Sequence, residues 1–534
     1  MKHLKTIICI LMAVCILLPF LPVKAHAATD SCGENLKWTL SAQGVLTISG
    51  TGEMDNFQAW SGAPWYSFND QIKKVVIKSG VTSIGDFAFM YCSKLTSVTI
   101  ADTVTQLGWG AFYSCEALTS VSIPKGVTEI GREAFYCCKN LKSVSFSANV
   151  SSIGDQAFSY CEKLTRFSVD SSNPYFSADS KGVLFNKDKT ILIQAPAGLT
   201  GHYTIPSTVH TLEYSAFAYT GISGVTIPNS VTAMKMDAFF HCKNLRSVEI
   251  PESVTTLGSR VFGSTGLTSV TVPGNIQTLS TDTFACCYDL KSAVIEEGVE
   301  IIGTSAFYEC TSLETVSISK TVKSIGIIAF YKCYAFKEFK VDEESAVFSN
   351  DDRGVLFDKE KTVLRIAPGG MEGSYQIPDS VTEIAADAFA FCRNLTEVTL
   401  PKNLQKIGRE SFYQCSSLQD MIFTSSAPEF DGNAFYNLTT TAHYPQDMPG
   451  WEDAVQQNYK GAITWVPYTS AMLGDVDMDG DVDVDDVLAL LWHVLFPDDY
   501  PIEVNADFDR NGTTDVDDVL TLLWHVLFPE DYPL

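Results

Sequence analysis

Hydrophobic and polar positions recur along most of the chain with a period of 22 or 23 residues. Each copy opens with an aliphatic residue, has phenylalanine at its ninth position and continues with a stretch of the form Leu-x-x-Val-x-Ile. The twelve copies begin at Val81, Val104, Val127, Val150, Val209, Val231, Val254, Ile276, Val299, Val322, Val381 and Leu404. A fixed period of this length is typical of a stacked repeat array.

The alternation within each copy predicts a short, half-buried strand, as at Leu95, Val98 and Ile100. One such unit is too small to bury its own apolar stripe. Stacked copies would align their phenylalanines, leucines and isoleucines into ladders along a continuous core. The pattern therefore predicts a β-rich repeat solenoid.

Two breaks of 59 residues interrupt the period, and the inserted segments span about 170–208 and 342–380. Each insert contains the sequence Gly-Val-Leu-Phe, at 182–185 and again 172 residues later at 354–357. A polar turn and a second apolar run follow in both, which predicts a β-hairpin in each insert. The spacing of the inserts indicates a larger duplication within the array.

The recurring Ile-Gly-x-x-Ala-Phe and Leu-x-x-Val-x-Ile-Pro elements resemble the BspA-like class of leucine-rich repeats. This resemblance implies a solenoid over 81–426, a β-rich N-terminal cap over 28–80 and a C-terminal cap over 427–467. Caps are expected because an open solenoid end exposes its core and a sheet edge. The family implies surface adhesion or protein binding without a common catalytic centre.

The charge of the chain restricts its partners. The 534 residues include 63 acidic and 37 basic side chains, a net charge of −26, which disfavours nucleic acid and anionic membranes as partners. Residues 474–534 hold 17 acidic side chains against a single basic one, Arg510. This shift in composition predicts a separate C-terminal domain, joined by a short linker at 468–473.

Residues 1–27 have the pattern of a secretory signal peptide. Lys2 and Lys5 precede an apolar run over Ile7–Leu21, and Ala25-His26-Ala27 fits a small-x-small cleavage site. The apolar run is shorter than the roughly 20 residues of a membrane span. We therefore expect no membrane insertion and a secreted protein, extracellular or held at the cell surface by a scaffold.

Most cysteines recur once per copy, as at Cys92, Cys115, Cys138 and Cys161. A periodic position flanked by aromatic residues favours small buried thiols over disulfides, although a secreted chain leaves both open.

The acidic C-terminal segment contains two loops with oxygen-bearing side chains at positions 1, 3, 5, 7, 9 and 12 and glycine at position 6. This is the spacing of an EF-hand calcium loop, so we expect two calcium ions. The predicted ligands are Asp475, Asp477, Asp479, Asp481, Asp483 and Asp486 in the first loop, and Asp507, Asp509, Asn511, Thr513, Asp515 and Asp518 in the second. Position 7 ligates through its backbone carbonyl, so Asp481 need not use its carboxylate.

Each loop leads into an amphipathic helix, and no convincing helix precedes the first loop. Two loop-helix units without entering helices resemble a type I-like dockerin, a small all-α calcium-binding module that binds the cohesin domains of cellulosome scaffoldins. The resemblance covers 474–534 and implies a cohesin as partner. Positions 10 and 11 of each loop and the following helix help to select the cohesin in that family. The matching residues are Val484, Asp485, Leu488, Val516, Asp517 and Leu520. Many dockerins have polar pairs at positions 10 and 11, so the hydrophobic-acidic pairs found here leave the identity of the cohesin open.

Two further sets of residues have more than one interpretation. The repeated Trp-His pairs at 492–493 and 524–525 suggest partner contact or packing more than metal binding. Tyrosines that follow the ladder phenylalanine suggest either a sugar-binding stripe or packing between coils, and packing is favoured. They are Tyr113, Tyr136, Tyr308, Tyr331 and Tyr413.

The sequence as a whole predicts an α+β leucine-rich repeat solenoid, β-rich and capped, with two β-hairpin inserts and a C-terminal dockerin. No unassigned stretch is large enough for a separate catalytic domain. We therefore expect a non-catalytic protein that binds an unknown protein or glycan and docks on a cellulosome-type scaffold that degrades polysaccharide. The alternative is a scaffold-borne glycoside hydrolase or peptidase with an unrecognised active site.

Overall fold

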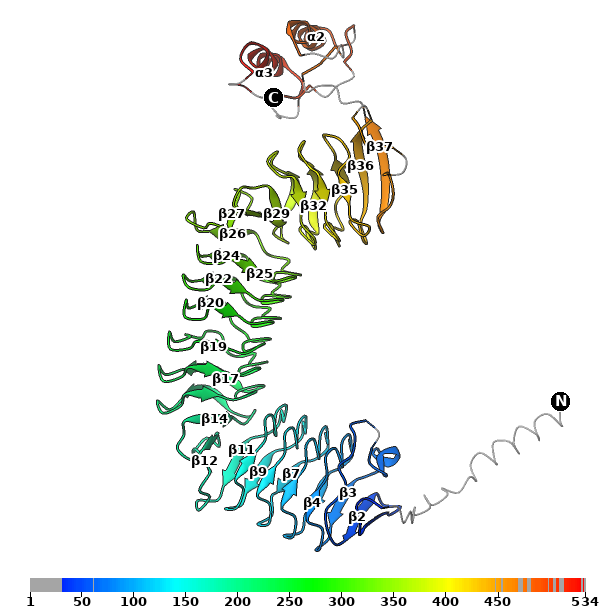
Figure 1. Ribbon diagram of the computed structural model, residues 1–534. Coiled ribbons are helices and arrows are strands. Elements are labelled where there is room, and N and C mark those ends of the chain that lie inside the picture. Colours follow the sequence, from blue (N-terminus) through cyan, green and yellow to red (C-terminus); the bar gives the residue numbers. More distant parts are fainter. Residues whose placement is uncertain are drawn as a thin grey trace, which may run out of the picture. The chain divides into compact units, whose positions relative to one another are not determined.

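The computed structural model describes residues 31–60, 62–446, 448–452, 455–468, 474–477, 482–497, 499–502, 506–508, 513–529 and 532. The predicted signal peptide and linker residues 469–473 lie outside this set. The chain divides into two compact units, Met1–Val347 and Phe348–Leu534 (Figure 1). None of the described helices has the length and apolar character of a membrane span. The domain boundaries expected from the sequence stay predictions.

The first unit opens with a β-rich cap. Strands β1 (Leu36–Leu40) and β2 (Val45–Gly50) form an antiparallel hairpin, and β3 (Lys74–Ile77) pairs with β2 in parallel. A short 3₁₀ helix, η1, covers Tyr66–Phe68. The buried Trp65 donates a hydrogen bond from Nε1 to the Ala88 carbonyl at 2.7 Å, and its ring stacks on Phe89 at 5.6 Å. Trp65 thus closes the end of the phenylalanine ladder.

Each following coil supplies short strands that pair in parallel with those of neighbouring coils. One row consists of β4 (Ser83–Ile84), β6 (Gln106–Leu107), β8 (Glu129–Ile130) and β10 (Ser152–Ile153). Its companion strands are β5 (Ser97–Thr99), β7 (Ser120–Ser122), β9 (Ser143–Phe146) and β11 (Arg166–Val169). From the first insert onward, new rows are formed by β15 (Thr200–Thr204), β16 (Thr211–Leu212), β17 (Gly221–Thr226), β18 (Ala233–Met234) and β19 (Thr256–Leu257). The last strands of the unit are β20 (Ser269–Val272), β21 (Thr278–Leu279), β22 (Ser292–Ile295), β23 (Ile301–Ile302), β24 (Thr315–Ile318), β25 (Ser324–Ile325) and β26 (Glu338–Val341). These rows confirm the predicted β-rich repeat fold.

The ninth-position phenylalanines form the predicted ladder. Phe135 is fully buried and stacks between Phe112 at 5.1 Å and Phe158 at 5.4 Å, with interplanar angles of 6° and 5°. The Phe135 N–H donates to the Ala157 carbonyl of the next coil at 2.8 Å. Ladder residues such as Phe135, away from the inserts, therefore link their coil to the neighbouring coils through both the ring and the backbone.

Two positions in each of the twelve copies have a left-handed backbone, the seventh and the eleventh. In the third copy these are Glu133 (φ 54°) and Cys137 (φ 58°). Among the twenty-four such residues only Gly110 is a glycine, so the remaining positions carry the steric cost of a Cβ atom in this region. The inter-coil hydrogen bonds at these positions, such as that from the Glu133 N–H to the Asp155 carbonyl at 3.0 Å, hold the chain there.

The cysteines expected to be buried thiols are free in the structure. Eight of them donate from Sγ to the carbonyl oxygen of the ladder phenylalanine in the preceding coil, over 3.0–3.3 Å. They are Cys115, Cys138, Cys161, Cys242, Cys287, Cys310, Cys333 and Cys415. Burial raises the pKa of the Cys287 thiol to about 11 and that of Cys115 well above its ordinary value.

We expect the native chain to react slowly with thiol reagents at pH 8. A raised pKa lowers the thiolate fraction, which for Cys287 falls to about one in a thousand at this pH. The half-buried Cys137 and Cys286 should be the first to react. A 5,5′-dithiobis(2-nitrobenzoate) titration with and without urea checks this expectation. Rapid native labelling of the fully buried thiols, or no gain on unfolding, would contradict it.

The first insert contains the predicted hairpin, β13 (Leu184–Asn186) with β14 (Ile191–Gln194). The structure adds a strand that the sequence did not predict, β12 (Phe176–Ala178), which pairs antiparallel with β13. The next partner of β14 is β16, in parallel. The insert is therefore a three-stranded meander built into one edge of the solenoid.

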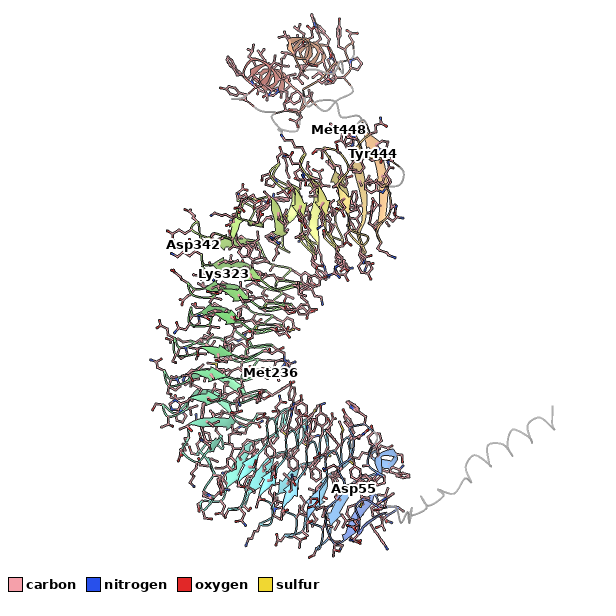
Figure 2. All side chains as sticks on the ribbon, viewed as in Figure 1. Asp55, Met236, Lys323, Asp342, Tyr444 and Met448 are labelled. Carbon is pink, nitrogen blue, oxygen red and sulfur yellow. The ribbon has the colours of Figure 1, made fainter. Side chains whose placement is uncertain are left out.

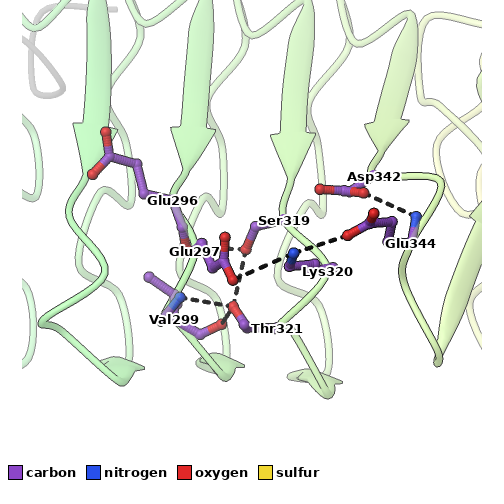
Figure 3. Close-up of polar contacts among 9 residues, drawn as sticks. Glu296, Glu297, Val299, Ser319, Lys320, Thr321, Asp342 and Glu344 are labelled. Atoms are coloured by element: carbon purple, nitrogen blue, oxygen red, sulfur yellow. Dashed lines mark hydrogen bonds and ion pairs between the residues drawn. The ribbon is translucent and has the colours of Figure 1, made fainter.

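Side chains also link coils at the surface. Figure 3 shows Lys320 between the carboxylates of Glu297 at 3.5 Å and Glu344 at 2.8 Å. In the same region the Thr321 hydroxyl donates to the Val299 carbonyl at 2.9 Å and the Ser319 hydroxyl to the Glu296 carbonyl at 3.0 Å. Each exposed ion pair of this kind contributes only about 0–1 kcal/mol, so the ladders dominate stability.

The second unit repeats this architecture. Its strands are β27 (Phe348–Asn350), β28 (Leu356–Asp358), β29 (Val363–Ile366), β30 (Glu372–Gln376), β31 (Glu383–Ile384), β32 (Asn394–Thr399), β33 (Lys406–Ile407), β34 (Asp420–Ile422), β35 (Glu429–Phe430), β36 (Thr439–Pro445) and β37 (Ala462–Tyr468). The hairpin predicted for the second insert is β28 with β29, and β27 again adds a third strand.

A pair of long strands ends the repeats of this unit, because β36 and β37 pair in parallel over seven residues each. The ring centroid of Tyr444 of β36 (Figure 2) lies 5.2 Å from that of Trp451. The ring centroid of Trp451 lies 4.8 Å from that of Phe423. These rings cover the last coil as a terminal cap must. Two helices follow, α2 (Val484–Leu495) and α3 (Val516–Leu527), with a small apolar core of their own.

Candidate functional site

Three carboxylates predicted as metal ligands come together at the start of α2. Asp475, Asp477 and Asp486 each offer an oxygen atom, and these atoms lie within 4.8 Å of one another. Asp475 is 4% exposed and Asp486 is 1% exposed. Asp477 is exposed, but anionic groups this close, two of them buried, repel one another unless a cation neutralises them.

Hydrogen bonds from the backbone fix Asp486. Its Oδ1 accepts from the N–H groups of Val476 at 2.5 Å and Asp477 at 3.1 Å, and its Oδ2 accepts from the Asp483 N–H at 2.8 Å. Asp483 caps α2 in return by accepting from the Asp485 N–H at 2.7 Å. The Asp486 carboxylate therefore joins the start of the loop to the first turn of α2.

The second loop repeats these contacts. Asp518 is fully buried and accepts from the Phe508 N–H at 2.6 Å and the Asp515 N–H at 2.8 Å. Asp515 accepts from the Asp517 N–H at 2.9 Å and from the Thr513 hydroxyl at 3.1 Å.

Four of the twelve predicted ligands lie outside the described residues, namely Asp479, Asp481, Asp509 and Asn511. The donor set among the described ligands consists entirely of oxygens, and Asp475, Asp477 and Asp486 are gathered around one point. This set fits a hard cation such as calcium, which binds six to eight oxygens. The occupancy of both loops by calcium stays a prediction.

Both helices present an apolar face to solvent. We call these faces the exposed helix stripes, and their side chains are 44–52% exposed. They consist of Val484, Leu488, Trp492, Leu495 and Phe496 on α2 and its C-cap, and Val516, Leu520, Trp524, Leu527 and Phe528 on α3 and its C-cap. The opposite faces bury Val487 and Leu490, and Val519 and Leu522. A row of exposed apolar side chains of this kind makes the stripes a candidate interaction surface.

The stripes include four of the six residues predicted to contact a partner, Val484, Leu488, Val516 and Leu520. The other two, Asp485 and Asp517, are exposed in the first helical turn. Leu495, Phe496 and their counterparts Leu527 and Phe528 lie outside the partner-binding set predicted from the sequence. The sequence pattern could have identified them, because apolar residues cover more of each helix than a single buried face requires.

The repeated histidines hold the ends of the helices. His493 Nδ1 lies 2.9 Å from the Tyr500 carbonyl oxygen, and His525 Nδ1 lies 2.9 Å from that of Tyr532. A carbonyl only accepts, so Nδ1 donates. This contact favours packing over a metal role for both residues.

The tyrosines that follow the ladder phenylalanines pack against one another. Tyr113 stacks on Tyr136 with centroids 4.8 Å apart, and Tyr308 stacks on Tyr331 at 6.3 Å. All four are half-buried. Because neighbouring rings occupy the ring faces, this arrangement favours packing between coils over a sugar-binding stripe.

The chain matches the family described as BspA type leucine-rich repeat region over residues 64–180, 210–337 and 373–446, in six copies. None of the curated proteins matches it. The matched segments cover more than half of the chain and end before the acidic C-terminal segment.

Several solved structures are similar to the chain. A leucine-rich repeat protein from Eubacterium ventriosum is 27% identical with a TM-score of 0.48, covering 72% of this chain and 93% of that one. A leucine-rich cell surface protein from Faecalibacterium prausnitzii is 23% identical with a TM-score of 0.39, covering 75% and 97%. The protein with this sequence belongs to the BspA-type leucine-rich repeat family.

Proposed function

We propose that this protein is a secreted, non-catalytic binding protein that is docked on a cellulosome-type scaffold. Its solenoid recognises a protein or a glycan. Residues 474–534 act as a calcium-dependent dockerin that binds a cohesin and thereby links the solenoid to polysaccharide degradation. The observation that carries the proposal is the cluster of Asp475, Asp477 and Asp486 at the start of a helix with an exposed apolar stripe.

Calcium, when bound, supplies the positive charge that neutralises the clustered carboxylates. The residues of the first loop that would hold it are Asp475, Asp477, Asp479, Asp481, Asp483 and Asp486, with the equivalent six in the second loop. The chain itself couples each loop to its helix, because Asp486 and Asp518 connect the two loops to the first turns of α2 and α3. Metal binding would therefore set the position of the exposed helix stripes.

The stripes supply an apolar partner surface of the kind that protein interfaces bury at their centre. The two helices differ only at Ala489 and Thr521. Both therefore present the same side chains, which supports two equivalent binding orientations related by a half turn.

The test is calorimetry of the full chain against a panel of cohesins in the presence of calcium. Saturable one-to-one binding to at least one cohesin supports the docking role, and no binding across the panel overturns it. Assays for reducing-sugar release and peptide cleavage address the alternative enzyme. Turnover by the purified chain would contradict the non-catalytic assignment.

Single changes on one stripe should have small effects on cohesin affinity. Leu488→Glu or Leu520→Glu alone should weaken binding about twofold, because one of two equal orientations is lost. The double variant should lose at least about 100-fold, since a charge then enters the interface in either orientation. The matched control is Thr521→Ala, which makes the two helices identical and should leave affinity unchanged. If Leu488→Glu alone abolishes binding, the two orientations are not equivalent.

A further inference from the structure

The stacking of coils is interrupted at the first insert. The row of short strands that begins with β4 ends at β10, and the next strand, β14, belongs to a different sheet. At eight ladder phenylalanines the carbonyl accepts from a cysteine thiol of the next coil. At Phe158 this carbonyl instead accepts from the side-chain Nε2 of Gln194 at 2.9 Å. The insert therefore holds two coils apart and substitutes its own side chain for the missing contact.

A cavity of about 220 Å³ lies at this interruption. Its apolar walls include Phe158, Phe176 and Ile193. Its polar lining residues are Asp155, Gln156, Asn186, Gln194, Glu213 and Tyr214. Asp155 is exposed, whereas Gln194 is 8% exposed, so the polar groups extend from the surface into the interior.

The second insert, 172 residues later in the sequence, serves as an internal comparison. At the positions of Phe158 and Phe176, the sequence around it has Phe330 and Phe348. It replaces the polar lining almost completely. Asp155, Gln156, Gln194, Glu213 and Tyr214 correspond to Ile327, Ile328, Ile366, Ala385 and Ala386. The insert therefore folds without these polar side chains, and their presence in the first insert calls for another reason.

Two buried hydroxyls, on residues that neighbour lining residues in the chain, are a further observation about this region. Among the described residues, three buried side-chain polar atoms lack a hydrogen-bond partner. Two of them are Ser159 Oγ and Ser215 Oγ, on residues adjacent in sequence to the lining residues Phe158 and Tyr214. Unsatisfied buried polar atoms are rare in folded proteins, and these two lie on the coils that adjoin the interruption, although neither residue lines the cavity.

The charges around the cavity define the ligand class. Glu213 pairs with Lys235 at 2.7 Å, and the Lys235 ammonium lies 4.8 Å from the centre of the Tyr214 ring. No basic residue lines the cavity, which disfavours anions. Carboxylates accept hydrogen bonds from hydroxyls, side-chain amides both donate and accept, and a tyrosine ring offers an apolar face. This combination suits an uncharged polyhydroxylated ring.

We propose that this cavity binds a single uncharged sugar ring, such as the terminal residue of a glycan. Its volume is below the roughly 300–1,000 Å³ of pockets for drug-sized ligands, so the part of a glycan that enters the cavity is restricted to one ring. The proposal rests on the binding role proposed for the solenoid and assigns that role to a defined pocket. It does not depend on the dockerin.

The test uses the full chain on an array of neutral, amino and acidic oligosaccharides, followed by calorimetry with the best neutral oligosaccharide. The double variant Glu213→Ala/Tyr214→Ala copies the residues of the second insert and is expected to fold, which circular dichroism and thermal melting verify. Its affinity should fall at least about tenfold. A second variant, Gln156→Ala, should also weaken binding. The control, Tyr288→Ala, removes an exposed tyrosine of another coil and should leave affinity unchanged.

The outcomes separate this proposal from the wider function. Three outcomes would each overturn the proposed sugar site. They are binding only to acidic or amino sugars, no binding to any sugar, and equal affinity in the double variant. Cohesin binding, measured on the same preparations, reports separately on the docking role.

Discussion

Replacing Phe135 with alanine should lower the free energy of unfolding of the first unit by about 3–5 kcal/mol. The side chain is fully buried, and its ring stacks on ladder rings of both neighbouring coils. Truncation removes this apolar surface and leaves a cavity that the stacked backbone cannot close. Urea denaturation followed by circular dichroism measures the change, as a lower midpoint.

The damage should also be local. Contacts in a solenoid are made between adjacent coils, so amide exchange should rise most in the coils beside Phe135 and least in distant ones. Ile327→Ala, at a side chain that is 75% exposed, is the control and should change stability by less than about 0.5 kcal/mol. Uniform loss of protection along the whole unit would show that the coils unfold as one block.

Removal of calcium should abolish cohesin binding and the helical order of residues 474–534, while the solenoid stays folded. Without a cation, Asp475, Asp477 and Asp486 repel one another at the point where the loop meets α2. A ligand present at 1,000 times its dissociation constant stabilises the folded state by about 4 kcal/mol. A domain with so small a core should depend on that contribution. Calorimetry and circular dichroism in calcium and in excess chelator measure the effect.

Variants of the loops separate calcium binding from helix exposure. Asp475→Ala with Asp507→Ala removes the first ligand of both loops and should reduce calcium uptake from two ions to none. The control is Asp485→Ala with Asp517→Ala, which removes two exposed carboxylates of the first helical turns and should leave calcium uptake unchanged. Full helicity and tight cohesin binding in excess chelator would contradict a calcium-dependent dockerin.

The repeat architecture could be predicted from the sequence because the same side chain recurs in every coil. The ladder of Phe112, Phe135 and Phe158 follows from the period alone, and so does the buried place of Cys115. The strand β12 and the adjoining cavity could not be predicted. They depend on how the insert meets Phe158 and Gln194, and this junction occurs once within the first unit.

The candidate metal site was predicted for a similar reason, since loop spacing constrains which oxygens can converge. Asp475, Asp477 and Asp486 lie together as the spacing requires. The exposed helix stripes were only partly predicted. Periodicity identifies an apolar residue on a helix, but whether Leu495 or Leu490 faces the small core depends on the packing of α2 against α3.

The paired left-handed residues of each coil bear on how such proteins grow. At about 1–2 kcal/mol for each residue with a side chain, two such positions disfavour a lone coil by about 2–4 kcal/mol. A single repeat outside an array would thus have no stable form, because no neighbouring coil fixes its backbone. Gene segments encoding several coils escape this constraint, because every internal coil arrives with its neighbours. The 172-residue internal duplication has the size of such a block, so lengthening by multi-coil units is the evolutionary route that the backbone geometry favours.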